Sequence, residues 1–193
     1  MNLISGVLSC TEGHMELAGK SINRISAYQR ARLGIARTFQ NLRIFPSLTV
    51  AQNIDVARYS DWHNPLVDSA IDVFDLKDKL SMQASTLSYG HLRRLEIVRA
   101  LALNPKVLML DEPAAGMNEL ETQELGSALE WVSHESDCAL LVIDHDLRFI
   151  MSLCKRIFVL NMGELVAEGT PTEITRNQIV IDAYLGENHE NAA

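Results

Sequence analysis

Two short, continuously apolar segments, each ended by acidic residues, place the strongest constraint on the fold of this chain. Residues 107–110 follow Asn104-Pro105 and end at Asp111-Glu112-Pro113, and residues 139–143 end at Asp144-His145-Asp146. A continuously apolar run of this length is typical of a strand buried on both faces. The stretch 119–132 between them predicts a helix, so we expect an α/β fold with a parallel sheet wrapped by helices.

The rest of the chain extends this organisation. Apolar residues recur at helical spacing between 46 and 102, which predicts a mainly helical subdomain inside the domain. Further elements are expected as a strand-to-loop segment at 34–40, a helix at 147–153, a strand at 156–160 with a paired strand after a turn, and a helix opening at Thr170-Pro171. We expect one domain over residues 1–186, followed by a polar tail at 187–193.

Charge and hydropathy exclude several classes of function. Lys and Arg number 17 against 25 Asp and Glu, a net charge of −8, and such a surface repels phosphate backbones. The apolar stretches are far shorter than the roughly 20 residues of a membrane-spanning helix. The three cysteines form no CxxC pair, which fits a reducing cytosol. We therefore expect a cytoplasmic protein with no nucleic-acid partner and no direct membrane insertion.

The residues that end the two apolar segments are the first candidates for chemistry. Ligands of parallel α/β sheets bind beyond the carboxyl ends of the strands. An aspartate there can hold Mg²⁺ through water, and an adjacent carboxylate can orient a water for attack on phosphorus, as Asp111 and Glu112 would. The simpler alternative is that acidic residues after a strand only solvate a loop.

A second candidate lies at the start of a strongly periodic helix. Ser88 and Gly90 precede its first turns, where free backbone N–H groups and the helix dipole favour an anion. Serine and glycine in this place are also common as simple helix caps. Along the same helix, Arg93, Arg94 and Arg99 are predicted to form a solvated polar side.

Taken together, these segments resemble the motif set of ABC-type ATPases, in the family's order. They are similar to the glutamine loop at Phe39-Gln40, the signature segment LSGGQ at Leu87–His91, the Walker B strand at Val107–Glu112, the D-loop at Ala114–Asn118 and the switch histidine at His145. The resemblance covers essentially the whole chain and is strongest to the ATP-binding subunits of branched-chain amino acid importers. It implies a P-loop NTPase-like sheet with helices on both faces and a helical signature subdomain at 46–102.

The resemblance implies catalytic and metal roles for four residues. Asp111 would hold the water shell of Mg²⁺, and Glu112 would polarise the attacking water. His145 would contact the γ-phosphate of ATP. Gln40 would link the metal and the water to the interface with the transporter.

The resemblance also implies that two such subunits sandwich two ATP molecules. The residues expected to bind nucleotide in this way are Ser88, Tyr89, Gly90, His91 and Asn118, and the signature residues would serve the ATP of the second subunit. Asn118 replaces the commoner D-loop aspartate, and His91 replaces the usual glutamine.

Partners and cofactors follow from the same resemblance. ATP and Mg²⁺ are the implied cofactors, and a second ABC ATPase subunit and transmembrane permease subunits are the implied partners. The chain would act at the inner face of the cell membrane, in the import of branched-chain amino acids or similar small polar solutes.

The phosphate loop G-x-x-x-x-G-K-[ST], which the family carries shortly before a helix end resembling residues 2–6, does not occur in the 193 residues. The sequence therefore predicts an N-terminally truncated cassette. The alternative function is a non-catalytic module that supplies Ser88 and Gly90 to a partner but binds no ATP of its own. Equilibrium nucleotide binding distinguishes the two functions.

Overall fold

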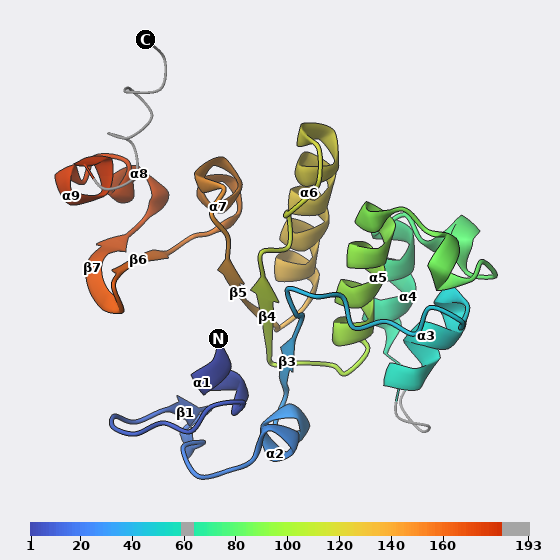
Figure 1. Ribbon diagram of the computed structural model, residues 1–193, viewed down its shortest axis with the longest axis horizontal. Coiled ribbons are helices and arrows are strands. Elements are labelled where there is room, and N and C mark those ends of the chain that lie inside the picture. Colours follow the sequence, from blue (N-terminus) through green and yellow to red (C-terminus); the bar gives the residue numbers. More distant parts are fainter. Residues whose placement is uncertain (59–63, 183–193) are drawn as a thin grey trace. The chain divides into compact units, whose positions relative to one another are not determined.

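The computed structural model describes residues 1–58 and 64–182, so the predicted polar tail at 187–193 lies outside the described residues. The contacts of the chain divide it into two compact units, Met1–His145 and Asp146–Ala193. Figure 1 shows the elements of both units in sequence colours. The single domain expected over residues 1–186 stays a prediction.

A three-stranded parallel sheet organises the first unit. Its strands are β3 (Ile35–Arg37), β4 (Val107–Asp111) and β5 (Ala139–Ile143), in the order β3-β4-β5. Leu108, Met109 and Leu110 in the central strand β4 are fully buried, which explains its unbroken apolar run. The predicted parallel sheet is confirmed.

Helix α6 (Glu119–Glu135) connects β4 to β5. Parallel neighbours need such a crossover, because a tight turn can join only antiparallel strands. The helix begins at Asn118, and its buried side carries Leu125, Leu129 and Val132. The predicted helix is therefore present and runs three residues beyond its expected end.

The segment between β3 and β4 is mainly helical. Its elements are α3 (Val50–Ala57), α4 (Pro65–Val73), the 3₁₀ turns η1 (Lys77–Lys79) and η2 (Ala84–Thr86), and α5 (Tyr89–Leu101). Figure 1 shows α3, α4 and α5 grouped together beside the sheet. Helix α5 contacts α3, α4 and β3, so it has neighbours on several sides.

The prediction of a solvated basic side on α5 is wrong. Arg93 and Arg94 are buried, with 0% and 8% of their surface exposed, and Glu96 is buried at 5%. Only Arg99 keeps an intermediate exposure. The reason is tertiary, because a helix packed between α3, α4 and β3 presents little of its circumference to water, and charged residues then need partners inside the protein.

Small elements form the beginning of the first unit. They are α1 (Asn2–Ser5), the antiparallel strands β1 (Glu16–Leu17) and β2 (Lys20–Ser21), and α2 (Ala27–Arg32). Helix α1 ends at Gly6, whose φ of 78° suits a glycine. Arg30 of α2 is 2% exposed and donates to the carbonyl groups of Leu3 and Ile4, which joins α2 to the end of α1.

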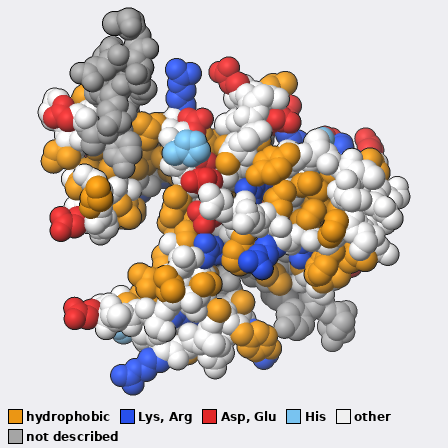
Figure 2. All heavy atoms as spheres, viewed as in Figure 1, with side chains coloured by type: hydrophobic (Ala, Val, Ile, Leu, Met, Phe, Trp, Pro, Cys, Tyr) orange, Lys and Arg blue, Asp and Glu red, His pale blue; other side chains and the backbone are white. Residues whose placement is uncertain are grey.

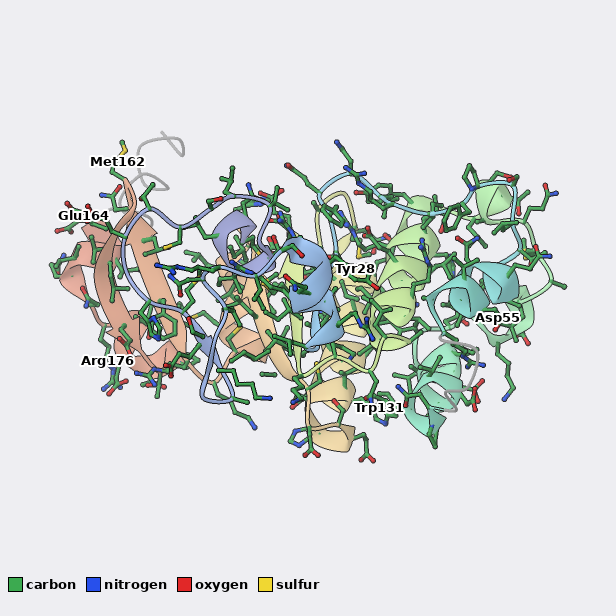
Figure 3. All side chains as sticks on the ribbon, turned by 90° about the horizontal axis from the view of Figure 1, so that it is seen from below. Tyr28, Asp55, Trp131, Met162, Glu164 and Arg176 are labelled. Carbon is green, nitrogen blue, oxygen red and sulfur yellow. The ribbon has the colours of Figure 1, made fainter. Side chains whose placement is uncertain are left out.

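The second unit is built on an antiparallel hairpin. Its elements are α7 (Leu147–Leu153), β6 (Ile157–Asn161), β7 (Glu164–Gly169), α8 (Pro171–Ile174) and α9 (Gln178–Val180). Figure 3 shows Met162 at the tip of the hairpin, where it is 99% exposed. Thr170 caps α8, and its backbone and hydroxyl groups donate to Glu173 and lower the pKa of that carboxyl. The predicted strand pair and following helix are confirmed.

Charges of both signs lie on the surface. In Figure 2, basic and acidic side chains are scattered among apolar and neutral ones on the face that the view presents. Among residues 1–58 and 64–182, no helix combines the length and apolar character needed to cross a bilayer.

Candidate functional site

The loops after the three parallel strands lie side by side. The Thr38 N–H donates to the Met109 carbonyl at 2.9 Å, and the Asp111 N–H donates to Thr38 Oγ1 at 3.3 Å. The Glu112 N–H donates to the Ile143 carbonyl at 2.8 Å. These bonds continue the sheet past its strand ends, and they bring the loops of Gln40, Glu112 and His145 to one edge.

Glu112 occupies a strained backbone position at this edge. Its φ of 46° lies in the left-handed region, which costs an L-residue other than glycine about 1–2 kcal/mol. The turn comes directly after β4 and before the buried Pro113. Strain of this kind is retained where the surrounding structure holds it, and it is concentrated at functional sites.

Asp111 is held by an arginine from the neighbouring strand. Arg37 Nη2 lies 2.8 Å from Asp111 Oδ2, and the two side chains are 11% and 22% exposed. Arg37 Nη1 also donates to Asn2 Oδ1 at 2.6 Å and to Ser5 Oγ at 3.2 Å. A single guanidinium therefore joins the end of β4 to helix α1.

Asp144 was among the residues expected to end the second apolar segment, but the sequence predicted no specific role for it. Its side chain is 1% exposed, and its Oδ2 accepts from the Ala114 N–H at 3.3 Å, at the start of the predicted D-loop. Its Oδ1 lies 3.6 Å from Nδ1 of His145, whose side chain is 75% exposed. Asp144 thus anchors the loop that presents His145. The available signal was its place directly after an apolar strand.

The signature residues form a second group at the start of α5. Ser88 caps the helix, as the simpler sequence reading proposed, and its Oγ lies 2.8 Å from His91 Nδ1. His91 Nε2 lies 2.9 Å from Asp75 Oδ2, which also pairs with Lys79 at 3.0 Å. The hydrogen bond from His91, followed by that from Lys79, lowers the pKa of Asp75.

The signature and D-loop segments touch each other within this chain. A Cβ placed on Gly90 would lie 3.1 Å from Glu121 Oε1, and one placed on Gly116 would lie 3.3 Å from Cε1 of Tyr89. Asn118 caps α6 through two hydrogen bonds of 3.0 Å. The Glu121 N–H donates to Asn118 Oδ1, and the Asn118 N–H donates to Glu121 Oε2. Ser88, Tyr89, Gly90, His91 and Asn118 therefore gather at the first turns of α5 and α6.

The cap at Asn118 yields a stability prediction. We expect Asn118→Ala to lower the free energy of unfolding by about 1 kcal/mol, because the N–H of Glu121 loses its acceptor. Asn118→Asp keeps an acceptor at the positive end of the helix dipole and should change stability by less than about 0.5 kcal/mol. Urea denaturation followed by circular dichroism measures both. Equal losses in the two variants would contradict the capping role.

Sequence reasoning also missed a buried ion pair on α5. Arg93 Nη1 lies 2.8 Å from Glu96 Oε2, and the two side chains are only 1% and 6% exposed. Their spacing of three residues could have signalled a pair. The burial that makes this pair important depends on the packing of α3, α4 and β3.

Comparison with protein families gives two matches. The family model described as "ABC transporter" matches residues 1–115, and that described as "Branched-chain amino acid ATP-binding cassette transporter" matches residues 164–190. The chain is 36% identical over 206 aligned positions to the high-affinity branched-chain amino acid transport ATP-binding protein LivG of Salmonella typhimurium, covering 96% of this chain and 81% of LivG. It is 34% identical, with the same coverage, to BraF of Pseudomonas aeruginosa.

Solved structures show the same fold. An ATP-binding cassette of an ABC transporter in its ADP conformation matches with a TM-score of 0.82 at 23% identity, covering 96% of this chain and 81% of that one. A nucleotide-free cassette matches with a TM-score of 0.76 at 23% identity, with 96% and 78% covered. The predicted fold class, that of ABC ATPase cassettes, is thereby confirmed.

Proposed function

Because the chain belongs to the ABC transporter ATP-binding family, we propose that it is the ATP-binding, energy-coupling subunit of an importer. The proposed cargo is branched-chain amino acids or similar small polar solutes, since LivG and BraF carry branched-chain amino acid transport in their names. One structural observation supports the proposal most directly. Gln40, the pair Asp111-Glu112, and His145 follow three adjacent parallel strands, where such sheets bind ligands.

The donor groups fit Mg²⁺ bound together with ATP. Asp111 and Gln40 offer carboxylate and amide oxygens, the ligands that this cation prefers. Within residues 1–58 and 64–182 there is no group of three or more His, Cys, Asp or Glu side chains that could hold a metal alone. That agrees with a cation held by one or two protein groups, water and substrate phosphates. When bound, ATP with its cation supplies the phosphoryl group that water attacks.

The residues at the carboxyl ends of the three parallel strands would have different roles. Glu112, which lies in the turn directly after β4, would accept a proton from the attacking water. The exposed His145 would donate a hydrogen bond to the terminal phosphate, with its loop anchored by Asp144. Gln40 is exposed and would face both the cation and the permease.

The signature group would act on the nucleotide of a second subunit. Ser88 and Gly90 lie at the first turn of α5, a helix of 13 residues whose free N–H groups and dipole favour a phosphate. Tyr89, His91 and Asn118 would line the same contact. We propose a paired assembly of two such subunits, located at the inner face of the membrane through permease subunits that dock near Gln40 and the helices within 46–102.

One observation favours the non-catalytic alternative. The carboxylate of Asp111, which would hold the cation's water shell, is paired at 2.8 Å with Arg37. The Arg37 guanidinium neutralises the carboxylate charge that Mg²⁺ would otherwise neutralise. A chain in this state could still supply Ser88 and Gly90 to a partner's ATP.

Uptake by cells tests the proposed function. We expect deletion of the gene, in cells without another leucine uptake system, to reduce uptake of radiolabelled leucine to background, and the wild-type gene to restore it. Normal uptake in the deletion strain contradicts a role in amino acid import. Restoration by Glu112→Gln as well as by the wild type would favour the non-catalytic alternative.

A further inference from the structure

We propose that Arg93 and Glu96 are positioning residues that fasten the glutamine-loop segment, residues 39–43, to the helix that carries the signature segment. This inference rests on the proposed function, because it gives the pair a role in placing Gln40. Neither residue belongs to a motif on which the family resemblance depends.

The burial of the pair shows that it needs partners. Arg93 and Glu96 lie one turn apart on α5, their side chains are 1% and 6% exposed, and Nη1 and Oε2 are 2.8 Å apart. Two charges removed from water are costly unless additional hydrogen bonds satisfy most of their remaining donors and acceptors. Of the nitrogen and oxygen atoms in these two side chains, Arg93 Nε alone has no hydrogen-bond partner. The positions of those additional bonds indicate what the pair is for.

The additional bonds go to the main chain of the glutamine loop. Arg93 Nη1 donates to the Phe39 carbonyl at 2.7 Å, and Nη2 donates to the Gln40 carbonyl at 3.3 Å. Glu96 Oε1 accepts from the N–H groups of Phe39 at 3.4 Å and Arg43 at 3.2 Å. The pair therefore holds the backbone on both sides of Gln40, while Gln40 itself stays exposed.

The same guanidinium reaches the signature segment. Arg93 Nη2 lies 3.4 Å from the Tyr89 hydroxyl, and the Arg93 guanidinium lies 6.0 Å from the centre of the Tyr89 ring. Tyr89 in turn packs against Gly116 of the D-loop segment. One buried cation thus contacts the carbonyl of Gln40 and a signature side chain.

Neighbouring contacts strengthen the attachment. Arg99, two turns along α5 from Arg93, donates to the Arg43 carbonyl. The Arg43 guanidinium lies 4.9 Å from the centre of the Phe39 ring. Because the loop is bonded to α5 at several points, a displacement of α5 must carry the backbone of Gln40 with it or leave buried charges unpaired.

Hydrogen–deuterium exchange on the full chain tests the attachment. In Glu96→Ala, we expect the amides of Phe39 and Arg43 to exchange about tenfold faster or more, since both lose a charged acceptor. The amides of the buried strand β4 exchange through global unfolding, so their rates report any overall loss of stability separately from the loop. The matched control is Glu124→Ala. Glu124 of α6 is half exposed and pairs with Arg94, the residue next to Arg93 on α5, so its removal should leave the exchange rates of residues 39–43 unchanged.

Two exchange results would overturn the attachment: wild-type rates at Phe39 and Arg43 in Glu96→Ala, or equal acceleration by Glu124→Ala. If Glu96→Ala unfolds, the paired replacement Arg93→Met with Glu96→Leu takes its place, because apolar residues of similar volume leave no buried charge unpaired. The same acceleration at residues 39–43 is expected from it.

Leucine uptake tests whether the attachment acts through Gln40. We expect the paired replacement to reduce uptake in the otherwise wild-type chain and to cause no further loss in a Gln40→Asn background. If the paired replacement lowers leucine uptake by the same factor in the Gln40→Asn background as in the wild-type chain, its role is merely structural and the proposal is overturned. If the wild-type gene supports no uptake, the proposed function fails, and the exchange experiment still decides whether the pair fastens the loop.

Discussion

Arg93→Met alone should lower the free energy of unfolding by about 3–5 kcal/mol. The methionine fills a similar volume but leaves the carboxylate of Glu96 buried without its cation. For a chain of 193 residues this corresponds to a decrease in Tm of roughly 10 °C. Chemical denaturation followed by circular dichroism measures the loss.

Two further variants show whether the unpaired charge is the cause. Arg93→Met combined with Glu96→Leu should recover most of the loss, since no buried charge remains and Gln40 and Arg43, whose main-chain groups lose the pair, are exposed residues. Arg94→Met removes an ion pair whose acid, Glu124, is half exposed, and should cost only about 1 kcal/mol. A double variant as unstable as the single one would refute this explanation.

In an assembled transporter whose chain also carries a phosphate loop, Glu112→Gln should slow ATP hydrolysis about 10²–10⁴-fold while leaving ATP binding within about a factor of three. Glutamine keeps the shape of the side chain but cannot accept the proton of the attacking water. The strained turn at φ 46° is retained, so the loop geometry should not change. Phosphate release gives the rate, and equilibrium binding of labelled ATP gives the affinity.

Glu119→Gln is the matched control for this substitution. Glu119 is an exposed acid in the first turn of α6, seven residues further along the chain, and its replacement should leave hydrolysis unchanged. Wild-type turnover in Glu112→Gln would show that the role given to Glu112 is wrong. An assembled wild-type transporter that binds no ATP through this chain would favour the non-catalytic alternative.

The elements that the sequence predicted well are those whose local pattern and tertiary environment agree. Val107–Asp111 and Ala139–Ile143 are strands, because continuous apolar runs suit a position inside a parallel sheet. The helix Glu119–Glu135 starts directly after Asn118, because the Asn118 side chain accepts a hydrogen bond from the otherwise free N–H group of Glu121. Such signals lie within a few residues of one another, so a single sequence is enough to detect them.

The charged contacts of the site could not be predicted in the same way. Arg93 was expected on a solvated polar side of its helix, yet it bonds to the Gln40 carbonyl, 53 positions away in the sequence. Arg37 pairs with Asp111 across 74 positions. No local pattern specifies which distant group a buried charge will meet.

The sequence by itself determined the order of the motifs and the positions of Gln40, Asp111, Glu112 and His145 at strand ends, because strand and loop patterns are local. Only the tertiary structure decided that α5 lies among α3, α4 and β3, and therefore that Arg93 and Glu96 are removed from water. Burial turns two ordinary helical charges into groups that must find hydrogen-bond partners, and the main chain around Gln40 provides them.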